Sequence, residues 1–315
     1  MNIQNAQGFD LTYRILHNAA PPAKITHEES DADILSPSRG FMCGFDWTMQ
    51  LQVGCPGGCL YCYVPNGPRL TPKDVRGPGG THWGFVVRDK LEVARKLKRR
   101  LEKGDLADKT VYWSGVTDPY AAAPEVTREV WRALCEAPPQ LRPRRIAVQS
   151  RFRADRDAAL MAEYENSHRP TDGGPAIVVS FSVGTDRNDL IRSWERATPL
   201  FEQRAQAIST LRQSDIFVVA TLSPFGLWND LPGALARFKD IGVAYVTVLF
   251  FKKGTPSANT PAKFREYLGK THPELLDPEW QRERLREIRA VYGDNRVIVG
   301  QDGFSSLARP HAISG

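Results

Sequence analysis

The sequence has no apolar run that approaches the roughly 18 residues that a membrane-spanning helix needs. Its first residues, MNIQNAQGFD, also lack the basic segment followed by an apolar segment that is typical of a secretory signal. No internal repeat is evident. These absences predict a cytoplasmic protein without a membrane partner.

Charge of one sign is in only small excess. The 315 residues include 42 Lys and Arg against 36 Asp and Glu, which gives a formal net charge of +6. The basic residues are spread along the chain, so nucleic acid is a permitted partner that the composition does not indicate. Hydrophobic residues at 41% and charged residues at 25% are ordinary for a soluble globular protein and exclude a disordered or fibrous chain.

Cysteine is scarce and unevenly placed. Five cysteines is an odd number for a disulfide framework, and Cys55, Cys59 and Cys62 fall within eight residues. This clustering suits a metal in a reducing compartment better than disulfide bridges. Cys43 and Cys135 lie elsewhere in the sequence, and we do not expect them to be ligands of the same centre.

Short β-rich runs alternate with helical patterns from the cysteine region onward. Strands are predicted at 47–53, 110–115, 145–150, 176–183, 216–222 and 244–251. Helices are predicted at 88–103, 124–136, 155–165, 199–213, 231–240 and 279–291. Strands that are apolar on both faces need a parallel sheet covered by helices. We therefore predict an α/β fold with a partial (β/α)6 TIM-like barrel of parallel strands, and a doubly wound sheet is the alternative.

Three regions are expected along the chain. Residues 1–45, rich in Pro, Ser, Asp and Ala, predict an irregular N-terminal arm. Residues 46–251 carry the barrel core, and residues 252–315 form a C-terminal extension that closes the barrel. In either architecture the ligand site lies beyond the carboxyl ends of the strands, where this sequence is unusually polar.

The stretch GCPGGCLYCY places three cysteines at C-x3-C-x2-C spacing directly after the first predicted strand. The glycines let the backbone curl round an inorganic centre, and three thiolates hold a [4Fe-4S] cluster that keeps one iron without a protein ligand. That iron can chelate S-adenosylmethionine, and an electron from the cluster then breaks the sulfonium C–S bond. The alternatives are a set of buried free thiols or a structural zinc site, which needs Cys43 or a remote histidine as fourth ligand.

This loop resembles the signature of the radical SAM superfamily, including Tyr61 before the last cysteine, a position that in the family packs beside the adenine. Further stretches resemble the spore photoproduct lyase-like branch, whose founding enzyme reverses a thymine photodimer in DNA. The resemblance implies a role near the cofactor for Tyr63, with catalysis through radical relay. It also implies that a set of strand-end residues binds the cofactor: Thr117 and Asp118 in GVTDPY, Arg151 in QSRF, and Ser182, Glu195 and Arg196 in SFSVGTDRNDLIRSWERATP.

Each of these residues also has a purely structural interpretation. Thr117 and Asp118 are also typical of the residues that cap a helix, and Arg151 and Arg196 of surface residues. Ser182 is equally consistent with a polar barrel layer, and Tyr63 with simple packing. One departure concerns the substrate: where the lyase has a cysteine that returns hydrogen to the product radical, this chain has Val116. An aliphatic side chain is no such donor.

The sequence therefore predicts a radical SAM enzyme that forms a 5′-deoxyadenosyl radical and removes hydrogen from a substrate, with a [4Fe-4S] cluster and S-adenosylmethionine as cofactors. The resemblance implies an external electron donor of flavodoxin or ferredoxin type. The substrate is either nucleobase-containing or a small metabolite or peptide. A zinc-stabilised nucleic-acid-binding module without catalysis is the alternative from another class.

Overall fold

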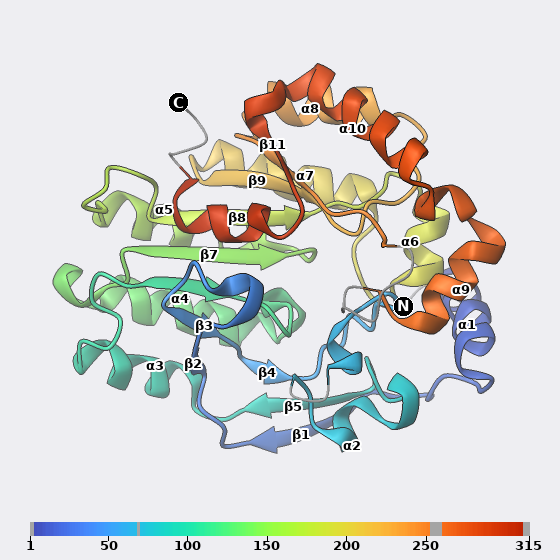
Figure 1. Ribbon diagram of the computed structural model, residues 1–315. Coiled ribbons are helices and arrows are strands. Elements are labelled where there is room, and N and C mark those ends of the chain that lie inside the picture. Colours follow the sequence, from blue (N-terminus) through green and yellow to red (C-terminus); the bar gives the residue numbers. More distant parts are fainter. Residues whose placement is uncertain (1–2, 68–69, 253–259, 311–315) are drawn as a thin grey trace.

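An eight-stranded sheet runs through the computed structural model, which describes residues 3–67, 70–252 and 260–310 (Figure 1). Its strands follow the spatial order β11-β10-β9-β8-β7-β6-β3-β2. Their bounds are β2 Leu35–Pro37, β3 Trp47–Met49, β6 Thr110–Trp113, β7 Arg145–Ser150, β8 Ile177–Ser182, β9 Phe217–Leu222, β10 Val246–Val248 and β11 Val297–Val299. Every neighbouring pair is parallel except β2 and β3, which are antiparallel.

The order of the strands decides between the two predicted architectures. From β3 to β10 the neighbours in the sheet follow their order in the chain. Right-handed crossovers that always step in one direction put their helices on one face. A doubly wound sheet reverses its strand order at a switch point, and this sheet does not. The fold is the predicted α/β partial barrel, and β2 and β11 are its edges in the part of the chain that the structure describes.

Helices connect the parallel strands and cover the outer face of the sheet (Figure 1). Their bounds are α3 Val93–Glu102, α4 Pro124–Glu136, α5 Ala158–Ser167, α7 Phe201–Gln213, α8 Leu231–Asp240 and α10 Pro278–Tyr292. The strands are apolar on both faces because each face has its own core. Along β6, Val111 and Trp113 belong to the large core under the helices, whereas Tyr112 between them belongs to a smaller inner core.

The predicted strand at 47–53 is two strands in different sheets. β3 ends at Met49, and β4 (Gln52–Val53) joins a three-stranded sheet in the order β1-β5-β4, with β1 at Thr26–Ser30 and β5 at Val86–Lys90. The side chain of Gln50, between the two strands, donates to the Ser114 carbonyl and accepts from the Thr117 N–H at 3.1 Å. These two hydrogen bonds fix Gln50 at the end of β6, and the chain leaves the barrel sheet at this residue.

Two further predictions about local structure are wrong. Residues 1–45 are no irregular arm, because α1 (Ile3–His17) buries Phe9, Tyr13 and Leu16 on one face, and β1 and β2 follow. The predicted helix at 88–103 begins only at Val93, since the residues before it pair in β5. The described part of the chain also contains α2 (Lys73–Arg76), α6 (Asn188–Trp194), α9 (Ala262–Thr271) and α11 (Asp302–Ser305).

The C-terminal region adds to the inner core of the barrel. Leu307 and Ala308 pack with Tyr112, Val178 and Tyr245 on the inner face of the sheet. That the whole extension closes the barrel stays a prediction. A search for membrane-spanning helices among the described residues finds no helix that is long and apolar enough.

Candidate functional site

The cysteine loop directly follows β4 and packs closely against the backbone of residues 84–86. Gly54 has φ +88°, and a Cβ there would lie 2.5 Å from the Val86 carbonyl oxygen. Gly84 has φ +91°, and its Cβ would lie 2.6 Å from the Cα of Gly58. Real Cβ atoms do not come this close to backbone, so glycine is required on both sides of this contact.

Backbone hydrogen bonds fix the course of the loop. Within it, the Gly58 N–H donates to the Cys55 carbonyl at 3.2 Å and the Cys62 N–H to the Cys59 carbonyl at 3.0 Å. The loop also bonds to the end of α6 and the residues after it: the Leu60 N–H donates to the Trp194 carbonyl, and the Arg196 N–H donates to the Gly57 carbonyl. The loop thus depends on contacts with β5 and with the end of α6.

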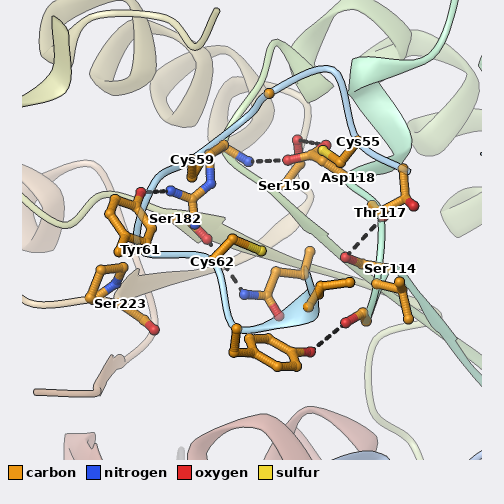
Figure 2. Close-up of a pocket in the computed structure, with 18 of the residues that line it drawn as sticks. Cys55, Cys59, Tyr61, Cys62, Ser114, Thr117, Asp118, Ser150, Ser182 and Ser223 are labelled. Carbon is orange, nitrogen blue, oxygen red and sulfur yellow. Dashed lines mark hydrogen bonds between the residues drawn. The ribbon is translucent and has the colours of Figure 1, made fainter. Parts of the chain in front are cut away.

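The three cysteines of the loop line one pocket at the carboxyl ends of the parallel strands (Figure 2). This inner pocket encloses about 1110 Å³, part of it open to solvent. The residues that line it, besides the three cysteines, are Gly57, Tyr61, Tyr63, Val64, Trp83, Ser114, Gly115, Val116, Thr117, Asp118, Gln149, Ser150, Arg151, Phe152, Ser182, Ser223, Pro224, Leu249, Phe250, Thr260, Gln301 and Phe304.

Burial raises the pKa of all three thiols, that of Cys62 to about 12. Backbone N–H groups oppose this effect at two of them. Asp118 and Gly57 donate to the sulfur of Cys55, and Val64 donates to that of Cys62. These bonds favour thiolates, the form that ligates iron, and such N–H···S bonds are typical around iron–sulfur clusters.

The set of thiols fits a cluster with three protein ligands. Of the two other cysteines, Cys43 is exposed, and the thiol of Cys135 donates to the Leu160 carbonyl at 3.5 Å. Among the residues that the structure describes, no group of three His, Cys, Asp or Glu side chains is arranged to hold a metal ion. A cubane spreads its thiolates over separate irons, so they need not converge on one point.

Thr117 and Asp118, which follow β6, form hydrogen bonds to the cysteine loop and to the end of β7. The Thr117 hydroxyl lies 3.0 Å from the Gly54 carbonyl oxygen. The Asp118 carboxylate accepts from the Ser150 hydroxyl at 2.7 Å and from the backbone N–H of Tyr120 and Arg151. Burial raises the pKa of Asp118 despite these bonds. Both side chains border the pocket, but their polar atoms face protein partners.

A buried charge network stands beside Tyr61. The Arg151 guanidinium donates to the Tyr61 hydroxyl and to Glu195, where the distance is 3.1 Å. The Tyr61 hydroxyl itself donates to Glu195. Arg204, which is fully buried, donates to the other carboxylate oxygen. Burial opposes ionisation of Glu195, but Arg204 and Arg151 outweigh it and lower its pKa to about 2.

The sequence did not single out Arg204. A signal was present, because Arg204 lies on the buried face of α7 with Phe201 and Ile208, where a cation needs a partner. Glu195 touches Tyr61 and Arg151 without lining the inner pocket.

Arg196 lies behind the loop, where its side chain contacts Gly58, stacks on Phe85 at 4.5 Å and donates to the Gly84 carbonyl. This placement does not favour a role for Arg196 in binding the cofactor.

The remaining predicted residues meet at the pocket wall. Tyr63 donates its hydroxyl to the Gly115 carbonyl, next to Val116. Ser182 accepts from the Gln149 amide at 3.5 Å, and Gln149 also accepts from Tyr112. Val116 itself lines the pocket and offers no polar atom there.

No family model matches the sequence, and no curated protein matches it. Solved structures of spore photoproduct lyase do match it in fold. A point variant of that enzyme superimposes with a TM-score of 0.54, and a form complexed with dinucleoside spore photoproduct with 0.52. The alignments cover 91% of this chain and 83% of the lyase chain, at 10% and 12% identity. A double variant with bound AdoMet and dinucleoside spore photoproduct aligns with a TM-score of 0.53, over the same share of each chain and at 11% identity.

Proposed function

We propose that this chain, which has the radical SAM fold in the form found in spore photoproduct lyase, is itself a radical SAM enzyme. Cys55, Cys59 and Cys62 would hold a [4Fe-4S] cluster with one iron open to S-adenosylmethionine. The enzyme would cleave the cofactor reductively and remove a hydrogen atom from a substrate in the inner pocket. An external electron donor of flavodoxin or ferredoxin type would supply the electron.

One observation carries the proposal: the three thiols of one loop line a pocket at the carboxyl ends of the strands, and the other two cysteines lie elsewhere. Three thiolates leave one iron of a cubane without a protein ligand. A cluster with such an open iron can bind a cofactor, whereas a cluster whose irons all have protein ligands only transfers electrons.

The residues around the thiols would bind and orient the cofactor. When bound, the cluster supplies one electron that breaks the sulfonium C–S bond of S-adenosylmethionine. The Arg151 guanidinium would donate to the carboxylate of the cofactor, and the ring of Tyr61 would pack beside its adenine; both residues line the inner pocket. Glu195 would act through both as a positioning residue, because it bonds to each of them.

The substrate is inferred from the resemblance to spore photoproduct lyase and from Val116, which lines the inner pocket. As a spore photoproduct lyase-like enzyme, the chain would act on a nucleobase-containing substrate, but Val116 stands where the lyase has its hydrogen-donating cysteine. We propose that the reaction ends differently, with Tyr63 as the candidate donor because its hydroxyl lies beside Val116 at the Gly115 carbonyl.

A second candidate is a tailoring enzyme of a small metabolite or peptide. Among the described residues that line the pocket, Arg151 is the one cation. A substrate phosphate would compete with the cofactor for it, which favours an uncharged substrate.

Anaerobic reconstitution with iron and sulfide tests the proposed function. We expect about four irons per chain, brown charge-transfer absorbance, and 5′-deoxyadenosine when dithionite and S-adenosylmethionine are added. Replacing any of the three loop cysteines by Ala should abolish cleavage, whereas Cys135→Ala should leave it intact. Uptake of zinc without iron, and no 5′-deoxyadenosine, would contradict the proposal and support the zinc-stabilised module.

A further inference from the structure

A second hollow lies behind the cysteine loop. This outer pocket encloses about 690 Å³, part of it open to solvent. It lies between α1, the loop and α9, and the residues that line it include Tyr13, Leu16, His17, Gly58, Leu60 and Lys263. Cys59 and Trp83 border both pockets, so these two side chains form part of the wall between them. The three-cysteine site can therefore be approached from outside without passing through the inner pocket.

The rim of the outer pocket carries positive charge. Lys263 is exposed and forms no ion pair with the described residues. Burial lowers the pKa of His17, and the nearby charge of Lys263 lowers it further. Arg14 is exposed one turn before His17 on α1. The acidic side chains on the same elements already have cations beside them: Glu266 pairs with Lys270 at 2.8 Å, and Asp10 acts on Arg196. The described rim therefore has an excess of positive charge.

The outward face of α1 is also apolar. Leu11 and Ile15, one turn apart, are 63% and 58% exposed, the two highest values among the large hydrophobic residues that the structure describes. They flank Arg14 on the face opposite the buried Phe9 and Tyr13. Exposed apolar residues that stand beside charged ones are typical of a surface that contacts another protein.

We propose that the outward face of α1 and the rim of the outer pocket form the docking surface for an acidic one-electron carrier of flavodoxin type. This inference rests on the proposed function, which needs an electron from outside while cofactor and substrate occupy the inner pocket. One electron would leave the reduced carrier, which is thereby oxidised by one electron, and would reduce the cluster that Cys59 and the other two loop cysteines would hold.

Charge distinguishes this partner from a second copy of the chain. Each chain has a net charge of +6, so two positively charged rims would repel each other. An acidic carrier is attracted instead, and the attraction speeds its association. Leu11 and Ile15 would add apolar contact once the carrier has docked.

The charge-reversal variant Arg14→Glu with Lys263→Glu tests the docking surface in the reconstituted full-length protein. We expect it to bind a recombinant bacterial flavodoxin at least about tenfold more weakly than wild type at low salt, as measured by isothermal titration calorimetry. Formation of 5′-deoxyadenosine driven by that flavodoxin and its reductase should fall by a similar factor. The dithionite-driven rate should stay unchanged, because dithionite needs no docking surface.

The matched control reverses Arg99 and Arg132, which are exposed, form no ion pair among the described residues, and lie on α3 and α4, far from α1 (Figure 1). Flavodoxin affinity that falls equally in both variants, or not at all, would contradict the docking surface. A loss of the dithionite-driven rate in the Arg14→Glu, Lys263→Glu variant would also contradict the docking surface.

Two further measurements show which of the two proposals has failed: analytical ultracentrifugation tests the docking partner, and the dithionite reaction of the wild type tests the proposed function. A wild-type dimer that becomes a monomer in the first variant would assign the surface to a second copy of the chain and overturn the inference. A wild-type protein that gives no 5′-deoxyadenosine even with dithionite would instead defeat the proposed function.

Discussion

Arg151 is charged although its side chain is largely buried. Burial disfavours its charged form, but Tyr61, Cys59 and Glu195 outweigh this effect and raise its pKa. Glu195 forms ion pairs with both Arg151 and Arg204, so its charge is divided between two cations. Both hydrogen bonds that the Arg151 side chain donates to described residues come from Nη1, so Nη2 could donate to an anionic group in the inner pocket.

Arg151→Gln tests this at the scale of one residue. We expect affinity for S-adenosylmethionine to fall about 10- to 100-fold, because a charge-assisted hydrogen bond is lost, while the iron content stays at the wild-type value. Equilibrium dialysis with labelled cofactor and an iron assay measure the two effects. Arg153→Gln is the control, since Arg153 pairs with Asp155 in the same turn and does not line the pocket. Equal affinity in both variants would return Arg151 to a structural role.

Glu195 makes stability depend on pH. Its pKa in the folded protein, about 2, lies below the ordinary 4.5, so the ionised carboxylate stabilises the fold above pH 4.5 and this contribution is lost as the pH falls towards 2. The shift corresponds to a contribution on the order of 3 kcal/mol. The free energy of unfolding should therefore fall more steeply between pH 5 and 2 in wild type than in Glu195→Gln, as urea denaturation would show. Parallel curves would mean that Glu195 is not held ionised by the two arginines.

At the scale of elements, the cysteine loop depends on its contact with the segment before β5. Gly84→Ala would put a Cβ 2.6 Å from the Cα of Gly58 and displace the loop. We expect the variant to take up less than half the wild-type iron and to lose about 2 kcal/mol of stability.

Gly104→Ala is the matched control for this change. Gly104 also has a positive φ, +75°, but a Cβ there meets no atom within 4 Å. It should cost about 1 kcal/mol and leave iron uptake unchanged. Equal loss of iron in the two variants would show that backbone conformation, and not the contact between residues 58 and 84, is what matters.

The sequence predicted the elements whose neighbours in the chain are also their neighbours in space. The strands of the barrel and their helices fall into this class, because apolar runs and amphipathic stripes alternate along the chain. The break between β3 and β4 was missed, since the residues that hold it, Ser114 and Thr117, come more than 60 positions later. Tyr61 escaped prediction as a partner of Glu195 for the same reason, because 134 positions separate the two residues. Arg204 is only nine positions from Glu195, and it was missed although a cation on the buried face of α7 needs a partner.

At the scale of the whole molecule, the C-terminal segment should unfold together with the barrel. Leu307 is fully buried against the inner face of the sheet with Tyr112 and Tyr245. Leu307→Ala should lower the free energy of unfolding by about 2–4 kcal/mol, because it leaves a cavity in that core. Urea denaturation followed by both fluorescence and circular dichroism should give coincident transitions.

Leu91→Ala is the control, because Leu91 is 38% exposed, outside the core, and its loss should cost less than about 1 kcal/mol. A separate early transition in Leu307→Ala would show that the C-terminal segment folds independently of the barrel.

The residues that hold the cysteine loop in place are spread widely along the chain. Gly84 and Thr117 contact it from one side, and Trp194 and Arg196 hydrogen-bond to it from another. A chain that is still being synthesised and has not reached residue 196 exposes three thiols without the scaffold that orients them. If the loop holds a cluster as proposed, iron and sulfide would be inserted in their final geometry only late in translation or after it, and the nascent loop would be a target for oxidation and for competing metals until α6 has docked.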